Sequence, residues 1–240
     1  MNLVLLFEDD FIAPDRVRLT GRRREHLIAV LKVEPGDGVT VGLVNGDVGV
    51  GRLLSQDRDW VELAVALTAG PPEPLPLTLV MAMPRPKMFR RVLQTVASLG
   101  VKDIWLINAY KVEKSFWQTP WLAENSLREN LALGLEQARD TQMPRVHIRK
   151  LFKPFVEDEL PALMQARPGL VAHPGAPRPL PSNLDTAATL CIGPEGGFID
   201  YEIAKLVEAG AQAMHLGRRI LRVEVAVPVL IGRLFDPCRF

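Results

Sequence analysis

Two stretches near the C-terminus decide the fold of this chain: TLCIGPEGGF at residues 189–198 and LGRRILR at residues 216–222. Each is a short apolar run that breaks abruptly into a loop containing glycine. Backbone N–H and C=O groups are exposed at such a break, so a small polar ligand can bind the main chain directly. Because about one βα unit separates the two loops, we expect both to line a single pocket.

The chain leading to these loops alternates strands and helices. Its apolar pattern predicts strands at 77–83, 104–108, 170–173, 189–192 and 213–216, and helices at 88–99, 124–139 and 200–209. Gly100 and Gly210 are expected to end two of the helices, and Asp200 is expected as an N-cap. The alternation indicates an α/β fold with a parallel sheet that carries helices on both faces.

A separate β-rich unit precedes this sheet. Strands at 39–44 and 48–54 flank Asn45-Gly46-Asp47, a hairpin signal because Asn-Gly readily adopts positive φ. A half-buried strand at 60–65 and a short helix at 24–31 complete a pattern typical of a small barrel. Four prolines at positions 71–76 form an extended spacer. We therefore predict two domains, residues 1–70 and 71–240.

Composition excludes several classes of protein. No apolar run approaches the roughly 18 residues that span a bilayer, and the N-terminus lacks a basic leader, so neither a membrane anchor nor a signal peptide is expected. The two cysteines, Cys191 and Cys238, provide neither a disulfide framework nor a metal site. A cytoplasmic protein is the expectation. Since the net charge is only +1, a nucleic-acid partner must be held by local basic patches.

The segment at 223–231 is ambiguous by local rules. Its β-branched residues favour a strand, and Pro228 opposes a continuous helix. On these grounds alone the segment is predicted to be a strand.

The motif IGPEGGF at 192–198, followed by Leu216-Gly217, Ile220-Leu221-Arg222 and Glu224, resembles the RsmE family. These proteins are ribosomal RNA uridine N3-methyltransferases of the SPOUT superfamily. EQAR at 136–139 and MPRV at 143–146 match a helix-to-strand passage of that family. The resemblance implies an α/β C-terminal domain with a deep trefoil knot and a small PUA-like N-terminal β-barrel that binds RNA. It also implies a final helix from about Val223, distorted or restarted near Pro228.

The resemblance further implies S-adenosylmethionine as cofactor, a homodimer, and a product methylated at N3 of one uridine in 16S ribosomal RNA. The partner would be this RNA or the small ribosomal subunit, and the reaction needs no metal. The cofactor-binding residues that it implies lie in three strand-end loops: His173 and Pro174; Ile192, Gly193, Gly196 and Gly197; Leu216, Gly217, Ile220 and Leu221.

Three residues are candidates for catalysis. Uridine N3 carries a proton and is a poor nucleophile until that proton is lost, so a base or a stabilising cation is expected. Arg222 would stabilise negative charge on the uracil oxygens or order the phosphate, and Glu195 or Glu224 would accept the proton or orient Arg222. The alternatives are structural: Arg222 as an ion-pair partner of Glu224 or a dimer contact, Glu195 as a backbone cap, and His173 as a backbone contact.

Basic residues form two clusters suited to phosphate binding. The predicted RNA-binding residues are Arg16, Arg18, Arg22, Arg23 and Arg24 in the N-terminal unit, and Arg85 and Lys87 before the first helix of the second. The alternative for each of these residues is an ordinary solvated side chain.

Two departures from the family keep other functions open. The family typically has Thr at the position of Val223 and Thr or Ser at the position of Val225, so a hydroxyl is lost at each. A knotted methyltransferase acting on another RNA, or a noncatalytic RNA-binding protein of ribosome assembly, therefore remains an alternative.

Overall fold

The computed structural model describes residues 2–236; Met1 and residues 237–240, which include Cys238, lie outside the described part. The chain forms two compact units. Unit 1 comprises Met1–Glu73 and Leu131–Met143, and unit 2 comprises Pro74–Asn130 and Pro144–Phe240. Helix α3 (Glu124–Ala138) crosses the division. The predicted division at residue 70 did not foresee that the segment 131–143 groups with the N-terminal unit.

Unit 1 is built on a six-stranded mixed sheet. Its strands, in spatial order, are β1 (Val4–Leu6), β4 (Gly38–Leu43), β5 (Val48–Gln56), β6 (Trp60–Ala69), β3 (Arg16–Thr20) and β2 (Phe11–Ala13). β1 runs parallel to β4, and the remaining neighbours are antiparallel. The predicted hairpin is confirmed, since β4 pairs with β5 across a turn in which Asn45 has φ +58°. The predicted helix is α1 (Gly21–Glu25), which continues as a π-helical segment over His26–Val30.

Strand β1 explains why part of α3 belongs to unit 1. Successive side chains of a strand point to opposite faces, so Val4 and Leu6 join the main core of the sheet. Leu3 and Leu5 pack instead with Ala132 and Leu135 of α3. The alternation of one short strand thus serves two hydrophobic clusters.

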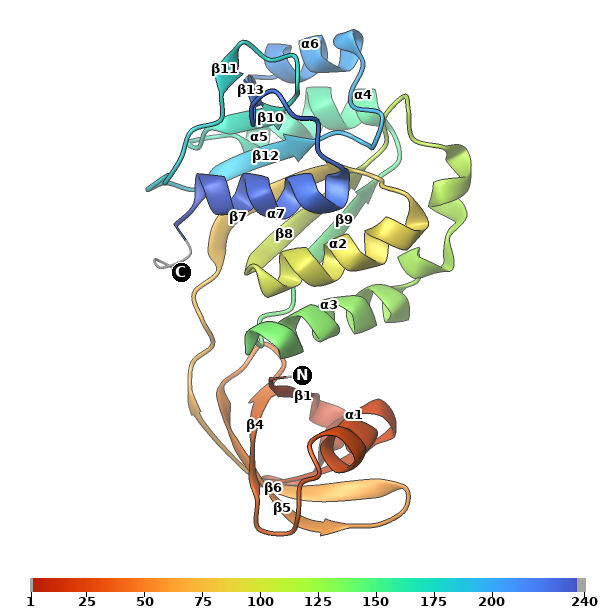
Figure 1. Ribbon diagram of the computed structural model, residues 1–240, viewed down its shortest axis with the longest axis vertical. Coiled ribbons are helices and arrows are strands. Elements are labelled where there is room, and N and C mark those ends of the chain that lie inside the picture. The colour runs from red at the N-terminus through yellow and green to blue at the C-terminus, as the bar shows by residue number, and fades with distance from the viewer. Residues whose placement is uncertain (1, 237–240) are drawn as a thin grey trace. The chain divides into compact units, whose positions relative to one another are not determined.

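Unit 2 contains a seven-stranded parallel sheet (Figure 1). Its order is β11 (Arg178–Pro179), β13 (Gln212–His215), β10 (Gly169–Ala172), β12 (Ala188–Ile192), β7 (Leu75–Ala82), β8 (Val101–Ile107) and β9 (Arg145–Arg149). Every pair of neighbours is parallel. The α/β fold with a parallel sheet is therefore confirmed, and all five strands predicted for this region exist with small shifts of their ends. β9 begins within the segment 143–146, where the family resemblance implied a passage from helix to strand, and β11 was not predicted.

The helices of unit 2 are α2 (Pro86–Ser98), α4 (Phe152–Pro154), α5 (Leu160–Leu163), α6 (Asp200–Glu208) and α7 (Val223–Leu234), with a π-helical segment at Phe155–Glu159. Short 3-10 turns lie at Lys114–Gln118 and Pro120–Leu122, and another in unit 1 at Glu8–Asp10. α2 packs against α7, and the two lie together in front of the sheet in Figure 1. Within residues 2–236, no helix combines the length and the apolar character needed to cross a membrane.

Helix α7 overturns the prediction made from local rules and agrees with the family resemblance. Its buried side chains recur with helical spacing: Val223, Val227, Leu230, Ile231 and Leu234. Pro228 lies inside the helix, where it removes one backbone donor. Packing of this apolar stripe therefore outweighs the strand preference of the β-branched residues and the cost of the proline.

Candidate functional site

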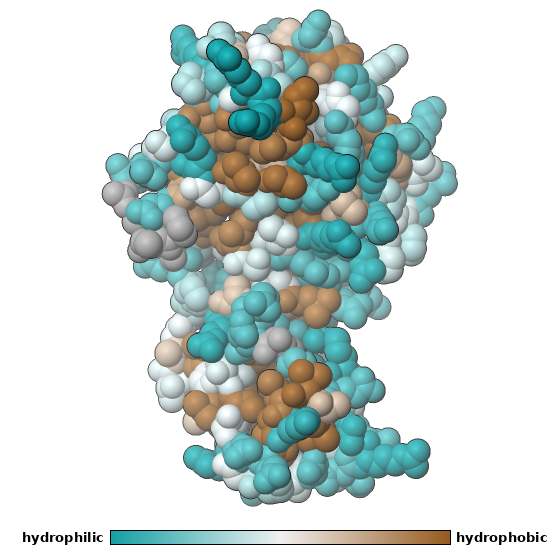
Figure 2. All heavy atoms as spheres, in the orientation of Figure 1, coloured by the Kyte–Doolittle hydropathy of each residue, from teal (hydrophilic) through white to brown (hydrophobic). Residues whose placement is uncertain are grey.

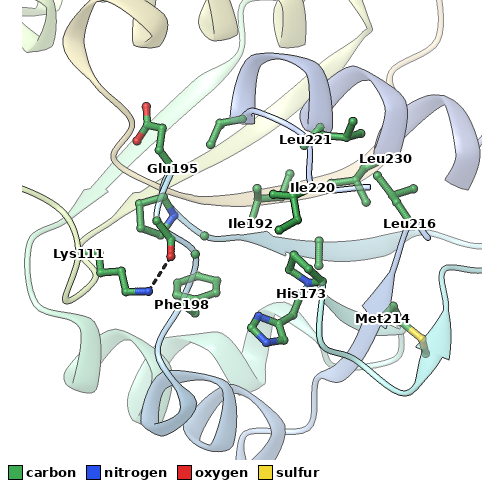
Figure 3. A pocket seen from close by; sticks show the side chains of 18 of the residues that line it. Lys111, His173, Ile192, Glu195, Phe198, Met214, Leu216, Ile220, Leu221 and Leu230 are labelled. Atoms are coloured by element: carbon green, nitrogen blue, oxygen red, sulfur yellow. Dashed lines mark hydrogen bonds between the residues drawn. The ribbon is translucent and has the colours of Figure 1, made fainter. Parts of the chain in front are cut away.

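Three adjacent strands of unit 2 end at one edge of the sheet. β13, β10 and β12 are parallel neighbours, so the loops that follow them emerge side by side. These loops line a cavity of about 600 Å³, a size typical of small-molecule sites (Figure 3). The ten residues predicted from the resemblance to bind the cofactor all line it: His173, Pro174, Ile192, Gly193, Gly196, Gly197, Leu216, Gly217, Ile220 and Leu221.

The loop after β12 is folded tightly against itself. The N–H of Gly197 donates to the C=O of Pro194 at 2.7 Å. A Cβ atom at Gly193 would lie 2.9 Å from the backbone nitrogen of Phe198, closer than real Cβ contacts allow. Gly193 is thus required by the close approach of two backbone segments. The turn therefore brings its main chain to the edge of the cavity, together with the residues Pro194, Glu195 and Phe198.

The loop after β13 depends on one backbone conformation. Gly217 has φ +123°, a region that residues with a Cβ rarely adopt. The chain then reaches Ile220, which is 81% exposed, before it enters α7. An apolar side chain held this open at the mouth of a cavity is available to contact a ligand or a partner.

The cavity has an apolar wall that the predicted residue set did not include. Met214 of β13 and Phe198 line it, and α7 contributes Val223, Ala226 and Leu230. The three α7 residues share one helical face, so the helix that the resemblance implies from about Val223 is the signal that could have identified them. Apolar walls with a few convergent backbone groups suit a flat, partly polar ligand.

Lys111 is a charged residue of the site that sequence reasoning missed. It lies in the loop after β8, and its Nζ donates to the C=O of Gly196 at 2.7 Å (Figure 3). The ammonium group therefore ties this loop to the glycine-rich turn. Because 85 positions separate the two residues, no local pattern could have indicated the contact.

The predicted catalytic residues are placed differently from one another. Glu195 lines the cavity, and its Oε1 accepts the N–H of Arg85 at 2.9 Å, beside the start of α2. Arg222 is the exposed N-cap residue of α7, and its C=O accepts the N–H groups of Val225 and Ala226. Glu224 is half-buried in the first turn of α7. Arg222 and Glu224 are not among the residues that line the cavity.

The start of α6 differs from the prediction. Ile199, rather than Asp200, is the N-cap residue, and Asp200 is the first residue of the helix. The carboxylate of Glu202 accepts the N–H of Ile199 at 3.0 Å and the N–H of Tyr110 at 2.7 Å, and it is 3% exposed. The side chain of the third helical residue thus accepts the N–H of the N-cap residue itself, which is the reciprocal half of a capping box.

Four of the predicted RNA-binding arginines make contacts within unit 1. Arg18 pairs with Glu62 at 2.7 Å, and Arg22 pairs with Glu136 at 2.8 Å. Arg23 forms an ion pair with Asp10, and Arg24 donates to the C=O of Asp57. The other three predicted residues, Arg16, Arg85 and Lys87, are exposed.

Cys191 is fully buried in β12, and burial raises the pKa of its thiol to about 12. The thiol is consequently protonated at neutral pH and is a poor nucleophile. In the part of the chain that the structure describes, no group of three or more His, Cys, Asp or Glu side chains could hold a metal ion.

Comparison with known proteins gives a consistent picture. Residues 71–234 match the family described as RNA methyltransferase domain. A Treponema pallidum protein named ribosomal RNA small subunit methyltransferase E is 29% identical over 236 residues, covering 94% of this chain and 87% of that protein. A Synechocystis protein of the same name is 27% identical over 238 residues, covering 93% of this chain and 75% of that protein.

A solved structure extends the likeness to three dimensions. The ribosomal RNA small subunit methyltransferase E of Neisseria gonorrhoeae, bound to S-adenosyl methionine, matches with a TM-score of 0.74 at 20% identity. The match covers 96% of this chain and 95% of that one. At this identity it establishes a shared fold.

Proposed function

Since this chain belongs to the RNA methyltransferase domain family, we propose that it transfers a methyl group from S-adenosylmethionine to N3 of one uridine in 16S ribosomal RNA. Its relatives from Treponema pallidum and Synechocystis are named ribosomal RNA small subunit methyltransferase E, which confirms the resemblance to the RsmE family. We place this activity in the cytoplasm, on the RNA or on the small subunit.

The convergence of three strand-end loops on one cavity is the observation that carries the proposal. The residues there fit the cofactor. Apolar side chains such as Ile192 and Leu216 offer a slot for a flat ring, and the glycine turns offer backbone groups for its polar edge. Glu195 and Lys111 also line the cavity, and their charged groups are held by the backbone of Arg85 and of Gly196.

We propose the finer features of the fold as well. Unit 1 is a PUA-like RNA-binding domain, and the C-terminal segment of unit 2 is knotted. Backbone hydrogen bonds of the loop between β10 and β12 support the knot. The N–H of Leu180 donates to the C=O of His215, and the N–H groups of Asn183 and Leu184 donate to the C=O groups of Arg233 and Leu234 at the end of α7. A crystal structure in which residues 217–236 pass outside the loop 173–187 would contradict the knot.

The proposed role of unit 1 has its own test. Arg16→Glu should weaken RNA binding, and an unchanged affinity for RNA would contradict this role.

The mechanism requires alignment and a charge partner. When bound, S-adenosylmethionine would supply the methyl group from its sulfonium sulfur. In-line transfer would form the N3–C bond as the S–C bond breaks, and the N3 proton would pass to a base. Holding the acceptor in line can lower the barrier by several kcal/mol, with about 7–11 kcal/mol as the ceiling. We assign Arg222 to the developing negative charge on the uracil oxygens, and Glu224 to accepting the N3 proton or orienting Arg222.

Glu195 has a more restricted role in this proposal. Because its carboxylate already accepts the N–H of Arg85, we assign it to holding the glycine turn in place and orienting Arg222, in preference to proton transfer. The RNA must present the uridine outside its stack, which is easiest in a loop.

The test combines binding with transfer. Wild-type protein should bind S-adenosylmethionine in calorimetry. It should also methylate one uridine in small ribosomal subunits purified from cells that lack this protein, as detected by mass mapping of the RNA. Arg222→Ala should abolish transfer and leave cofactor affinity within about twofold, since the proposed role of Arg222 is toward the acceptor alone. A fully active Arg222→Ala enzyme would return this residue to a structural role. Absence of cofactor binding would favour a noncatalytic protein, and an unmodified small-subunit uridine would favour another RNA substrate.

We propose a homodimer formed through α7. Val225 and Val229 lie four positions apart on this helix, and each is 44% exposed. With Ile220 they expose apolar surface, and Figure 2 shows apolar side chains gathered over α7 on this face of unit 2. Val225→Glu with Val229→Glu should convert a dimer into a monomer in light scattering. A wild-type monomer at micromolar concentration would refute the dimer.

A further inference from the structure

The loop after β8 presents an exposed aromatic residue beside the candidate site. Tyr110 is 79% exposed, although the residues on either side of the turn, Ala109 and Val112, are buried. The N–H of Val112 donates to the C=O of Ala109 at 3.0 Å, so Tyr110 and Lys111 are the two central residues of a β-turn. Both central side chains therefore project from the anchored ends of the turn.

Two contacts fix this turn against the loops that form the cavity. The N–H of Tyr110 donates to the buried carboxylate of Glu202, which also holds the N–H of Ile199. The Nζ of Lys111 donates to the C=O of Gly196. Ile199, Gly196 and Lys111 all line the cavity. The backbone of Tyr110 is thus pinned one residue from the cavity, and its side chain is left to solvent.

A rigid backbone that carries an exposed ring has a recognisable use. Nucleobases stack on aromatic side chains, and each such contact changes RNA affinity by roughly tenfold or more. Tyr and Phe serve this purpose equally well because the contact is made by the face of the ring. The ordering cost is small here, since the main chain of the turn is already fixed.

We propose that Tyr110 is an RNA-contacting residue that stacks on a nucleobase at the mouth of the cavity and so positions the target nucleotide. This inference rests on the proposed function, because it takes the occupant of the rim to be single-stranded RNA. Lys111 serves the same arrangement by holding the turn against Gly196.

The experiment separates stacking from charge. Fluorescence anisotropy would compare a labelled decauridylate with an abasic ribose-phosphate oligomer of the same length, which keeps the phosphates and lacks the bases. Tyr110→Ala should raise the Kd for decauridylate about tenfold and leave the Kd for the abasic oligomer within twofold. Tyr110→Phe should bind both probes like wild type.

Tyr201→Ala is the matched control. Tyr201 is the other tyrosine of the chain, is 52% exposed, and lies on α6 outside the turn. Its removal should leave both affinities unchanged, and an effect equal to that of Tyr110→Ala would overturn the assignment. Equal weakening of both probes by Tyr110→Ala, a Phe variant as weak as the Ala variant, or a wild-type protein that does not distinguish the two probes would overturn it too.

The same variants keep this inference apart from the proposed function. Calorimetry of Tyr110→Ala should give the wild-type affinity for S-adenosylmethionine, and its KM for small subunits should rise with kcat nearly unchanged. Wild-type protein that transfers no methyl group would refute the proposed function, whereas the anisotropy comparison would still report on Tyr110.

Discussion

The strand-end loops of unit 2 and the arginine-rich segment 16–24 of unit 1 both stand out in the sequence, yet the structure treats them differently. The loop residues meet around one cavity, as expected from their positions at the ends of neighbouring parallel strands. The arginines are adjacent in sequence, but Arg18, Arg22 and Arg23 each pair with an acidic residue of unit 1. Backbone geometry is encoded by residues that are neighbours in the sequence. Whether a charged side chain is available to a ligand depends instead on its ion-pair partner, which can be distant in the sequence.

The largest effect on cofactor binding should come from Gly217, because the backbone conformation of this residue shapes one of the loops that line the cavity. Because φ is +123° at this position, Gly217→Val would force the loop after β13 into another path. We expect affinity for S-adenosylmethionine in calorimetry to fall at least about 100-fold, or roughly 3 kcal/mol. Gly217→Ala should show a smaller loss of the same kind.

Gly70→Val is the matched control, since a Cβ atom there meets open space and no positive φ is involved. Its cofactor affinity and thermal midpoint should equal those of wild type. If Gly217→Val bound the cofactor with wild-type affinity, the backbone conformation of this loop would not be needed for cofactor binding. The cavity loops would then not differ from the arginine-rich segment in being defined by local backbone geometry.

The sequence predicted those features that depend on neighbours in the chain. The strand ends, the glycine turns and the hairpin at Asn45 were all indicated by local patterns. The position of Lys111 against Gly196 and the pairing of Arg22 with Glu136 were not, because 85 and 114 positions separate these partners. Helix α7 lies between the two cases: local preference indicated a strand, and burial of one helical face decided otherwise.

The second effect concerns Arg22 and tests whether the basic cluster is partly structural. Its guanidinium makes two hydrogen bonds to Glu136, at 2.8 and 3.1 Å, and Glu136 is 1% exposed. Arg22→Ala removes both bonds from a buried carboxylate. Breaking a fully buried pair costs about 3–5 kcal/mol. Since the side chain of Arg22 is 43% exposed, we expect about 2 kcal/mol less stability to urea unfolding.

Arg18→Ala is the control for this measurement. Arg18 and Glu62 are 47% and 16% exposed, so water replaces much of the lost interaction, and the expected cost is at most about 0.5 kcal/mol. Circular dichroism would follow both variants. Equal stability of the two would mean that Arg22 is as available to RNA as its neighbours, and the division within the cluster would disappear.

The smallest expected effect tests whether hydrogen-bond geometry or burial determines how much an ion pair stabilises the fold. Arg149 and Glu159 of unit 2 form two short hydrogen bonds, at 2.6 and 2.7 Å, but their side chains are 36% and 35% exposed. Hydrogen bonding to Arg149 holds the pKa of Glu159 below its usual value. Solvent screening limits the pair, so Glu159→Gln should cost only about 0.5 kcal/mol at pH 7.

The pH dependence of this cost follows from the direction of the shift. A carboxylate whose pKa is lower in the folded state stabilises the protein above its unfolded pKa, about 4.3, and this contribution is lost as pH falls through the folded pKa. The stability difference between wild type and Glu159→Gln should therefore be constant from pH 7 to about 5 and shrink below about pH 4. A cost near 2 kcal/mol, like that expected for Arg22→Ala, would show that hydrogen-bond geometry outweighs burial, and exposure could no longer distinguish structural arginines from those free to meet RNA.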